Sequence, residues 1–157
     1  MNIVEKLTER WRDINYPFLV HSSGELRFSE IAEQKAVDVS KVKSGDVVAL
    51  IGDFDPQSIL TLLQLIDKNV ILVPLTVDTR AQHKYFFESA LVDVVIEGEE
   101  VKRISHSIKH EIIESLRSNE HAGLVLFSTG TTGRPKAILH DLTLFMQRFE
   151  TRRPKIG

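Results

Sequence analysis

Five consecutive apolar residues, Val47 to Ile51, follow the turn-forming pair Gly45-Asp46 and constrain the fold more than any other stretch of this chain. A strand without polar residues on either face is typical of a parallel sheet that helices cover on both sides. The loop after this strand ends in Asp55, which can cap a helix, and in Pro56, which suits a first helical turn. The stretch therefore predicts a buried strand that leads into a helix.

The same alternation of strand and helix continues along the chain. Further apolar runs predict strands over 70–73, 92–96 and 124–127, and a hairpin-like segment spans 18–28. Helical spacing and capping residues predict helices over 1–12, 29–39, 56–67, 78–91, 104–116 and 142–149, with Ser29 as the cap of the second and Asp78 or Thr79 as the cap of the fourth. These elements predict an α/β fold, a mainly parallel sheet flanked by helices on both faces. No repeat or linker divides residues 1–157, so we expect one domain.

Composition limits the classes of function. The 157 residues are 42% hydrophobic and 27% charged, which suffices for one globular domain with a core. The net charge of −2 and the absence of a basic patch interleaved with aromatic residues argue against a nucleic-acid partner. No run approaches the roughly twenty apolar residues of a membrane span, so no membrane association is expected. The chain contains no cysteine, which excludes disulfides and thiolate sites and fits the cytoplasmic location that we expect.

The segment 128–136 carries the chemistry that the sequence predicts. It consists of Ser128, Thr129, Gly130, Thr131, Thr132, Gly133, Arg134, Pro135 and Lys136. The glycines let successive main-chain N–H groups converge on an anion, the hydroxyl groups add donors, and Lys136 adds a positive charge. Because ligands of open α/β sheets lie beyond the carboxyl ends of strands, the position after 124–127 agrees with this chemistry. The segment predicts a phosphate-binding loop, for which a nucleoside triphosphate is the natural ligand.

Two alternatives exist for this loop. A Walker-type loop needs a glycine directly before its lysine and a Ser or Thr directly after it, but this chain has Pro135 and Ala137 there. The other alternative is a hydroxyl-rich surface turn that binds nothing. The sequence favours a phosphate loop of a different type over both.

The same residues, with 125–127 before them and 137–140 after them, resemble the phosphate-loop signature of the adenylate-forming (AMP-binding) enzymes. This superfamily includes acyl- and aryl-CoA synthetases, firefly luciferase and the adenylation domains of peptide synthetases. The chain departs from the common pattern in the order Ser-Thr at 128–129 and in Ala137. Weaker similarity covers 18–28, 42–50 and 70–75, so the resemblance implies a partial amino-terminal subdomain of the adenylate-forming fold.

In intact relatives, the resemblance implies, a carboxylate attacks the α-phosphorus of Mg-bound ATP, and a thiol, usually that of coenzyme A, then displaces AMP. The loop residues Ser128, Thr129, Gly130, Thr131, Thr132, Gly133 and Lys136 would hold the phosphates, with Thr131, Thr132 and Lys136 in direct contact. The family's adenine-binding and magnesium-binding segments and its acylation lysine have no counterpart here. We therefore expect an amino-terminal fragment of an ATP-dependent carboxylate-activating ligase that retains at most ATP or pyrophosphate binding, and we assign it no catalytic residue.

A second hypothesis is a phosphate-binding or interaction module that needs a partner chain supplying the missing ligase part. Its basis is an apolar stripe, formed by Leu142, Phe145, Met146 and Phe149, that we expect to be exposed and to favour self-association or binding of a partner.

Other polar residues have simpler interpretations. His106 and His110 are spaced to share a helix face, but no third ligand is evident, so no metal site is predicted. His140 follows the loop, where it can contact a nucleotide or lie on the surface. Asp53 and Asp55 resemble an acid-base pair, but capping of the next helix explains them more simply.

Overall fold

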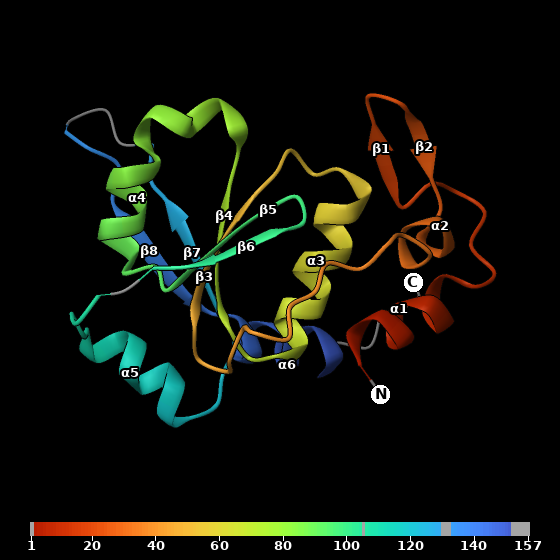
Figure 1. The fold of residues 1–157 in the computed structure, drawn as a ribbon. Coiled ribbons are helices and arrows are strands. Elements are labelled where there is room, and N and C mark those ends of the chain that lie inside the picture. Colours follow the sequence, from red (N-terminus) through yellow and green to blue (C-terminus); the bar gives the residue numbers. More distant parts are fainter. Residues whose placement is uncertain (1, 105, 130–132, 152–157) are drawn as a thin grey trace.

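The computed structural model describes residues 2–104, 106–129 and 133–151. Within these residues the chain forms a six-stranded sheet and a separate two-stranded hairpin, with helices around them (Figure 1). The elements in chain order are α1 (Ile3–Trp11), β1 (Leu19–His21), β2 (Gly24–Leu26), α2 (Phe28–Ala32), β3 (Val47–Ile51), α3 (Pro56–Asp67), β4 (Ile71–Leu75), the 3-10 helix η1 (Val77–Gln82), α4 (His83–Ala90), β5 (Val94–Glu97), β6 (Glu100–Arg103), α5 (Glu111–Ser118), β7 (Gly123–Phe127), β8 (Ala137–Asp141) and α6 (Leu142–Thr151).

The strand order in the large sheet is β6-β5-β3-β4-β7-β8. The four inner strands run parallel to one another, whereas β6 pairs antiparallel with β5 and β8 pairs antiparallel with β7. Every residue of β3 is buried, as its unbroken apolar sequence predicts. The predicted α/β class with a mainly parallel sheet is therefore confirmed.

Each face of the sheet carries its own hydrophobic core. Successive residues of β3 point to opposite faces, so Ala49 packs with Phe86 of α4 while Leu50 packs with Leu65 of α3. Helices α4 and α5 cover the first face, and α3 with the start of α6 covers the second (Figure 1). The hairpin β1–β2, α1 and α2 lie beyond α3, away from the sheet. The sheet is thus flanked by helices on both faces.

Helix α3 begins as its sequence predicts. Asp55 adopts an extended conformation at the N-cap and accepts a hydrogen bond from the amide of Ser58 at 3.0 Å, and Pro56 occupies the first turn. The helix ends at Asp67, and Asn69 follows with a φ of 54°, a left-handed conformation that asparagine tolerates. Local signals were sufficient here because the cap and the end both depend on neighbouring residues.

Three predicted helices differ from the observed ones. The helix expected over 29–39 is only α2, with Arg27 and not Ser29 at its N-cap. Beyond it, the carboxylate of Asp38 accepts from the amide of Ser40, a local bond that competes with the helix, and Val37 is buried in the second core. The helix expected from Asp78 or Thr79 is η1 followed by α4, which begins at His83.

The helix expected over 104–116 begins only at Glu111, where the ring of His110 accepts from the amide of Ile112. Upstream, residues 100–103 form the unpredicted strand β6, which reverses from β5 near Gly98, a glycine with a φ of 58°. Ile108, expected on the buried face of this helix, is 63% exposed. Strand β6 thus ends before position 104, and the described residues between it and Glu111 are not helical.

Candidate phosphate-binding loop

The predicted loop connects β7 to β8 at the carboxyl edge of the parallel strands. Phe127 is the last residue of β7 and pairs with Ala137, the first residue of β8. The loop therefore leaves the same edge at which β3 and β4 end. No element was predicted between the loop and the helix expected over 142–149, but 137–141 return along β7 as an antiparallel strand before α6 begins. Pairing with β7 is a long-range contact that the local sequence does not specify.

Two reciprocal hydrogen bonds close the base of the loop. The amide of Ser128 donates to the carbonyl oxygen of Lys136 at 2.9 Å, and the amide of Lys136 donates to Oγ of Ser128 at 3.0 Å. The hydroxyl oxygen of Ser128 thus accepts from the loop's other end, while its O–H remains available as a donor. Ser128 therefore fixes the loop's base and still offers a group to a ligand.

Tyr85 of α4 supports the same end of the loop. Its hydroxyl group donates to the carbonyl oxygen of Pro135 at 2.7 Å, and the guanidinium carbon of Arg134 lies 5.0 Å from the centre of its ring. This distance is within the range of a cation–π contact. Tyr85 lies within the helix predicted over 78–91, where its bulk is the only property that the sequence indicated. The polar hydroxyl in the run Tyr85-Phe86-Phe87 was the available signal.

The structure brings Ser128, Thr129, Gly133 and Lys136 together at the end of one hairpin. Gly133 has a φ of 87°, a left-handed conformation that most side chains avoid, and Lys136 is exposed. The other predicted contacts, Gly130, Thr131 and Thr132, lie outside the described residues.

A depression of about 510 Å³ opens beside the loop. Its polar wall includes Ser128 and Thr129 together with Thr76, Thr79 and Gln82, which follow β4. Pro74, Phe86 and Leu126 belong to its apolar wall. A volume of this size with few polar groups on an apolar lining is typical of a small-molecule site.

The loop after β3 is fixed by its aspartates. Asp53 accepts a hydrogen bond from the amide of Val77 at 3.1 Å, which joins this loop to the one after β4. Burial raises the pKa of Asp55, but hydrogen bonds from the hydroxyl and amide groups of Ser58 lower it, and the resulting pKa lies below the ordinary value. Both carboxylates are thus occupied in holding the backbone. The capping interpretation is confirmed for Asp55, whereas Asp53 bonds to Val77 and does not cap α3.

His106, His110 and His140 do not form a ligand site in this structure. His106 and His110 do not share a helix face, because both precede α5: His106 Nε2 lies 2.7 Å from Oδ1 of Asp93, and His110 caps the helix. His140 pairs with Leu124 at the far end of β7 from the loop. Over 2–104, 106–129 and 133–151, no group of three or more His, Asp or Glu side chains is placed to hold a metal ion. Nor does any helix in these ranges have the length and apolar character needed to cross a bilayer.

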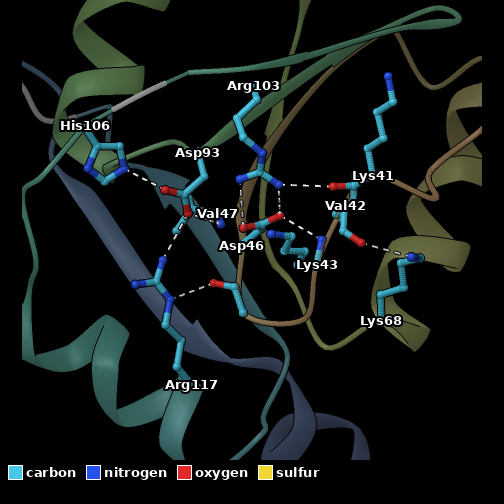
Figure 2. Close-up of polar contacts among 11 residues, drawn as sticks. Lys41, Val42, Lys43, Asp46, Val47, Lys68, Asp93, Arg103, His106 and Arg117 are labelled. Atoms are coloured by element: carbon cyan, nitrogen blue, oxygen red, sulfur yellow. Dashed lines mark hydrogen bonds and ion pairs between the residues drawn. The ribbon is translucent and has the colours of Figure 1, made fainter.

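A second polar cluster lies at the opposite edge of the sheet, where β3 and β5 begin (Figure 2). Asp93 accepts from the amide of Val47 at 2.8 Å and from Arg117 at 3.0 Å. Arg117 also donates to the carbonyl oxygen of Gly45 at 2.8 Å, and Arg103 pairs with Asp46 at 2.7 Å. Sequence analysis missed this cluster because its members are far apart in the chain. It joins α5 and β6 to the start of β3 and lies away from the loop.

Among the comparisons with known proteins, only the search of solved structures found proteins similar to this chain. No protein-family model matches the sequence, and no curated protein matches it either. The N-terminal subdomain of NpsA from Klebsiella oxytoca, solved in complex with anthranilyl-AMSN, matches with a TM-score of 0.61 and 20% sequence identity, covering 98% of this chain and 44% of that one. VinN matches with a TM-score of 0.56 and 14% identity, covering 91% of this chain and 46% of that one.

A third structure, an artificially fused adenylation–PCP di-domain of NpsA and ThdA from Klebsiella oxytoca, has a TM-score of 0.55 and 19% identity, covering 87% of this chain and 31% of that one. This chain therefore spans less than half the length of each of these structures. At these identities the likeness establishes the fold, which is the fold found in the N-terminal subdomain of NpsA.

Proposed function

We propose that this chain is the amino-terminal part of an ATP-dependent carboxylate-activating ligase and that the loop 128–136 holds the phosphates of ATP. The observation that carries the proposal is the position of this loop. A glycine-rich hairpin end with hydroxyl groups and Lys136 lies beside a depression at the carboxyl edge of a parallel sheet. The likeness of the fold to an adenylation protein supports the same conclusion.

The reaction of such a ligase explains the chemistry of the loop. A carboxylate oxygen forms a bond to the α-phosphorus of ATP, the bond between this phosphorus and the bridging oxygen breaks, and pyrophosphate leaves with the negative charge. In this chain the hydroxyl groups of Ser128 and Thr129 and the ammonium group of Lys136 are the donors that stabilise that charge. Their bonds to phosphate strengthen as charge develops, which is the condition for accelerating the step.

The donors of the loop fit phosphate better than they fit a metal ion. Amide and ammonium groups donate to anions and cannot coordinate a cation, and 128–136 contains no carboxylate, the side-chain ligand that Mg²⁺ commonly takes. We therefore assign no magnesium ligand to this chain, and Mg²⁺ enters with the ATP that it coordinates. By the resemblance of the loop, the acceptor in the second half of the reaction is a thiol such as that of coenzyme A.

A second candidate function is a module that works only with a partner polypeptide. Of the predicted apolar stripe on α6, Phe145 and Phe149 are 53% and 61% exposed, whereas Leu142 packs against the second core and Met146 is half-buried. The aromatic part of the stripe favours this candidate, because large exposed aromatic rings are typical of surfaces that bind another protein.

Isothermal titration of the purified chain with ATP, pyrophosphate and adenosine tests the proposed function. We expect ATP and pyrophosphate to bind and adenosine to bind much more weakly, because the assigned contacts are to phosphate. Lys136→Ala is expected to lower the affinity for pyrophosphate about tenfold, the equivalent of about 1.4 kcal/mol. The control is Lys43→Ala, which removes an exposed lysine at the opposite edge of the sheet. The proposal fails if neither phosphate ligand binds or if both lysine variants bind equally well.

A further inference from the structure

A pocket of about 290 Å³ lies at the carboxyl ends of β3 and β5, on the first face of the sheet. The last residues of these strands, Ile51 and Glu97, are part of its lining. Strands β3 and β5 are neighbours, but the chain first forms β4 on the other side of β3, so the order of the strands reverses between β3 and β5. Open α/β sheets bind ligands beyond the carboxyl ends of the strands at such a reversal. We call this cavity the β5 pocket; within the described part of the chain it shares no lining residue with the depression beside the loop.

The buried polar side chain of the β5 pocket is His83, at the start of α4, with 5% of its surface exposed. Its Nε2 lies 3.0 Å from the carbonyl oxygen of Thr76. A carbonyl oxygen can only accept, so Nε2 carries the hydrogen and Nδ1 of the neutral ring is an acceptor. Over the residues that the structure describes, no group donates to Nδ1. Because a buried acceptor without a partner is costly, a ligand that donates a hydrogen bond would stabilise this position.

Strand β6 adds two charges of opposite sign to the pocket. Glu100 and Lys102 lie two positions apart, so they project from the same face of the strand, about 6.5 Å from each other along it. No described residue forms an ion pair with either of them. The other two charged groups of the lining, Arg80 and Glu97, are paired with each other. The described lining is therefore neutral as a whole and offers an unpaired cation beside an unpaired anion.

The rest of the lining is apolar. Lys102 is the cross-strand partner of Val95, which packs against the first core. The other apolar residues of the pocket also belong to that core or pack against it: Ile51, Phe87 and Ile104. The ring centre of Phe87 lies 5.7 Å from that of His83, so apolar surface adjoins the histidine. A few polar groups on an apolar lining are typical of a pocket for a small organic molecule.

We propose that the β5 pocket binds an apolar α-amino acid in its zwitterionic form, as a site additional to the phosphate loop. The ammonium group donates to Nδ1 of His83 and to Glu100, and the carboxylate accepts from Lys102. The side chain packs on Phe87 and Val95. Because both charged groups of an α-amino acid are attached to one carbon atom, the ligand can bridge an anion and a cation that are neighbours on one strand. A simple carboxylic acid leaves Glu100 unpaired and supplies no donor to His83, and a phosphate adds negative charge beside Glu100.

Titration of the ¹⁵N-labelled chain with L-leucine and L-phenylalanine tests the inference. We expect saturable changes at the backbone amides of Glu100 and Lys102, and a shift of the Nδ1 resonance of His83 as this atom accepts a hydrogen bond. For ligands of this size we expect a dissociation constant of about 1 mM. L-Phenylalaninamide and N-acetyl-L-phenylalanine each lack one charge and should bind at least about tenfold more weakly. The inference is overturned if neither amino acid gives saturable changes at these positions, or if the two derivatives bind as well as L-phenylalanine.

Two lysine variants test the contact to the carboxylate. Lys102→Ala removes an exposed side chain without a described partner, so the fold should be unchanged, and we expect L-phenylalanine to bind about tenfold more weakly. The matched control, Lys84→Ala, removes an exposed lysine of α4 that lies outside the lining, and its affinity should stay within about twofold of the wild type. Equal affinities of the two variants would overturn the inference.

A variant that fills the pocket separates this inference from the proposed function. Val95→Phe adds bulk at a partly buried position of the lining and should abolish binding of L-phenylalanine. Its affinity for pyrophosphate should be unchanged, because no residue of the loop is altered. Retained binding of L-phenylalanine would contradict the β5 pocket and leave the loop's role standing. A wild-type chain that binds L-phenylalanine but not pyrophosphate would contradict the loop's role and leave the pocket standing.

Discussion

The hydroxyl group of Tyr85 reaches across 50 positions of the chain to the carbonyl oxygen of Pro135, at 2.7 Å. The ring itself packs against the first core, so its position is set by α4 and not by the loop. With Arg134 over its face, Tyr85 holds the carboxyl-terminal end of the loop, next to Lys136. A rigid element thereby positions the cation that we assign to phosphate.

Removal of that hydroxyl group should weaken both the fold and the loop. Tyr85→Phe keeps the ring and leaves the carbonyl oxygen of Pro135 without its donor, so we expect a loss of about 1 kcal/mol in the free energy of unfolding. Urea unfolding measures the loss, and Tyr16→Phe is the control because Tyr16 is 69% exposed. Equal stabilities of the two variants would show that the bond to Pro135 contributes nothing.

The carboxylate of Asp55 predicts a pH dependence. Because its hydrogen bonds to Ser58 outweigh the effect of burial and lower its pKa, its contribution to stability is complete above the unfolded pKa of about 3.9. The contribution is lost as the pH falls through the lower pKa of the folded state. Asp55→Asn keeps a capping oxygen but does not titrate.

We therefore expect the wild type to be more stable than Asp55→Asn by at most about 1 kcal/mol at pH 7, since the carboxylate is partly exposed. The difference should shrink toward zero at pH 2 to 3. Thermal unfolding of both proteins at the two pH values measures it. A difference that is the same at both pH values would show that the charge of Asp55 is not involved.

At this scale, what could be predicted depended on distance along the chain. The cap by Asp55 follows from residues three positions apart and was predicted. The base of the loop joins Ser128 to Lys136, eight positions apart, and the motif indicated its chemistry but not its bonds. Tyr85 was missed because its partner lies in a different element.

Helix α5 packs on the sheet through Ile113 and Leu116, and the side chain of Arg117 adds polar bonds to it. The guanidinium group of Arg117 donates to Gly45, Asp93 and Glu114 at 2.6 to 3.0 Å (Figure 2 shows the first two). A planar group with several fixed donors can make these bonds at once, whereas the single ammonium group of lysine cannot. A positive charge alone is therefore not sufficient to make these bonds at position 117.

We expect Arg117→Lys to destabilise the protein by about 1 to 2 kcal/mol, because it leaves partly buried acceptors without donors. Chemical denaturation measures the change. The control is Arg10→Lys on the exposed face of α1, which should change stability by less than about 0.5 kcal/mol. The role of the planar group is refuted if Arg117→Lys is as stable as the wild type.

Helices and strands were predicted correctly where the residues that specify them lie within one segment. Strand β3 and helix α3 carry unbroken apolar or capped patterns and were predicted with their observed bounds. The segment 104–116 was predicted as one helix from its apolar spacing, but the helix begins only at Glu111. Before it, His106 bonds to Asp93, and Arg103 of the preceding strand bonds to Asp46, so long-range contacts hold this part of the chain. Strand β8 was missed for the same reason, since its pairing partner is β7.

At the scale of the whole molecule, the chain covers only part of the structures that it resembles. It spans less than half of the NpsA and VinN structures that it matches. We therefore expect the chain alone to show no carboxylate-dependent exchange of labelled pyrophosphate into ATP, measured with a panel of carboxylic acids. An exchange rate that rises above the acid-free background when a carboxylic acid is added would contradict this expectation.

The fold class and the edge that carries the loop followed from the alternation of apolar strands and helices. The depression beside the loop did not, because it is built from elements that meet only in the folded chain. The exposure of the paired residues Leu126 and Ile138 likewise depends on the register between β7 and β8. The phosphate chemistry of the motif thus stays a prediction, and tertiary structure determines what surrounds the loop.

The most direct test of phosphate binding is a titration of the ¹⁵N-labelled protein with pyrophosphate, followed by the chemical shifts of its backbone amides. We expect the largest changes at Ser128, Thr129, Gly133 and Lys136, and none at Val47, whose amide lies at the opposite edge and donates to Asp93. Saturable shifts confined to the loop would support the account. Loop amides that do not move at millimolar pyrophosphate, or shifts centred elsewhere, would contradict it.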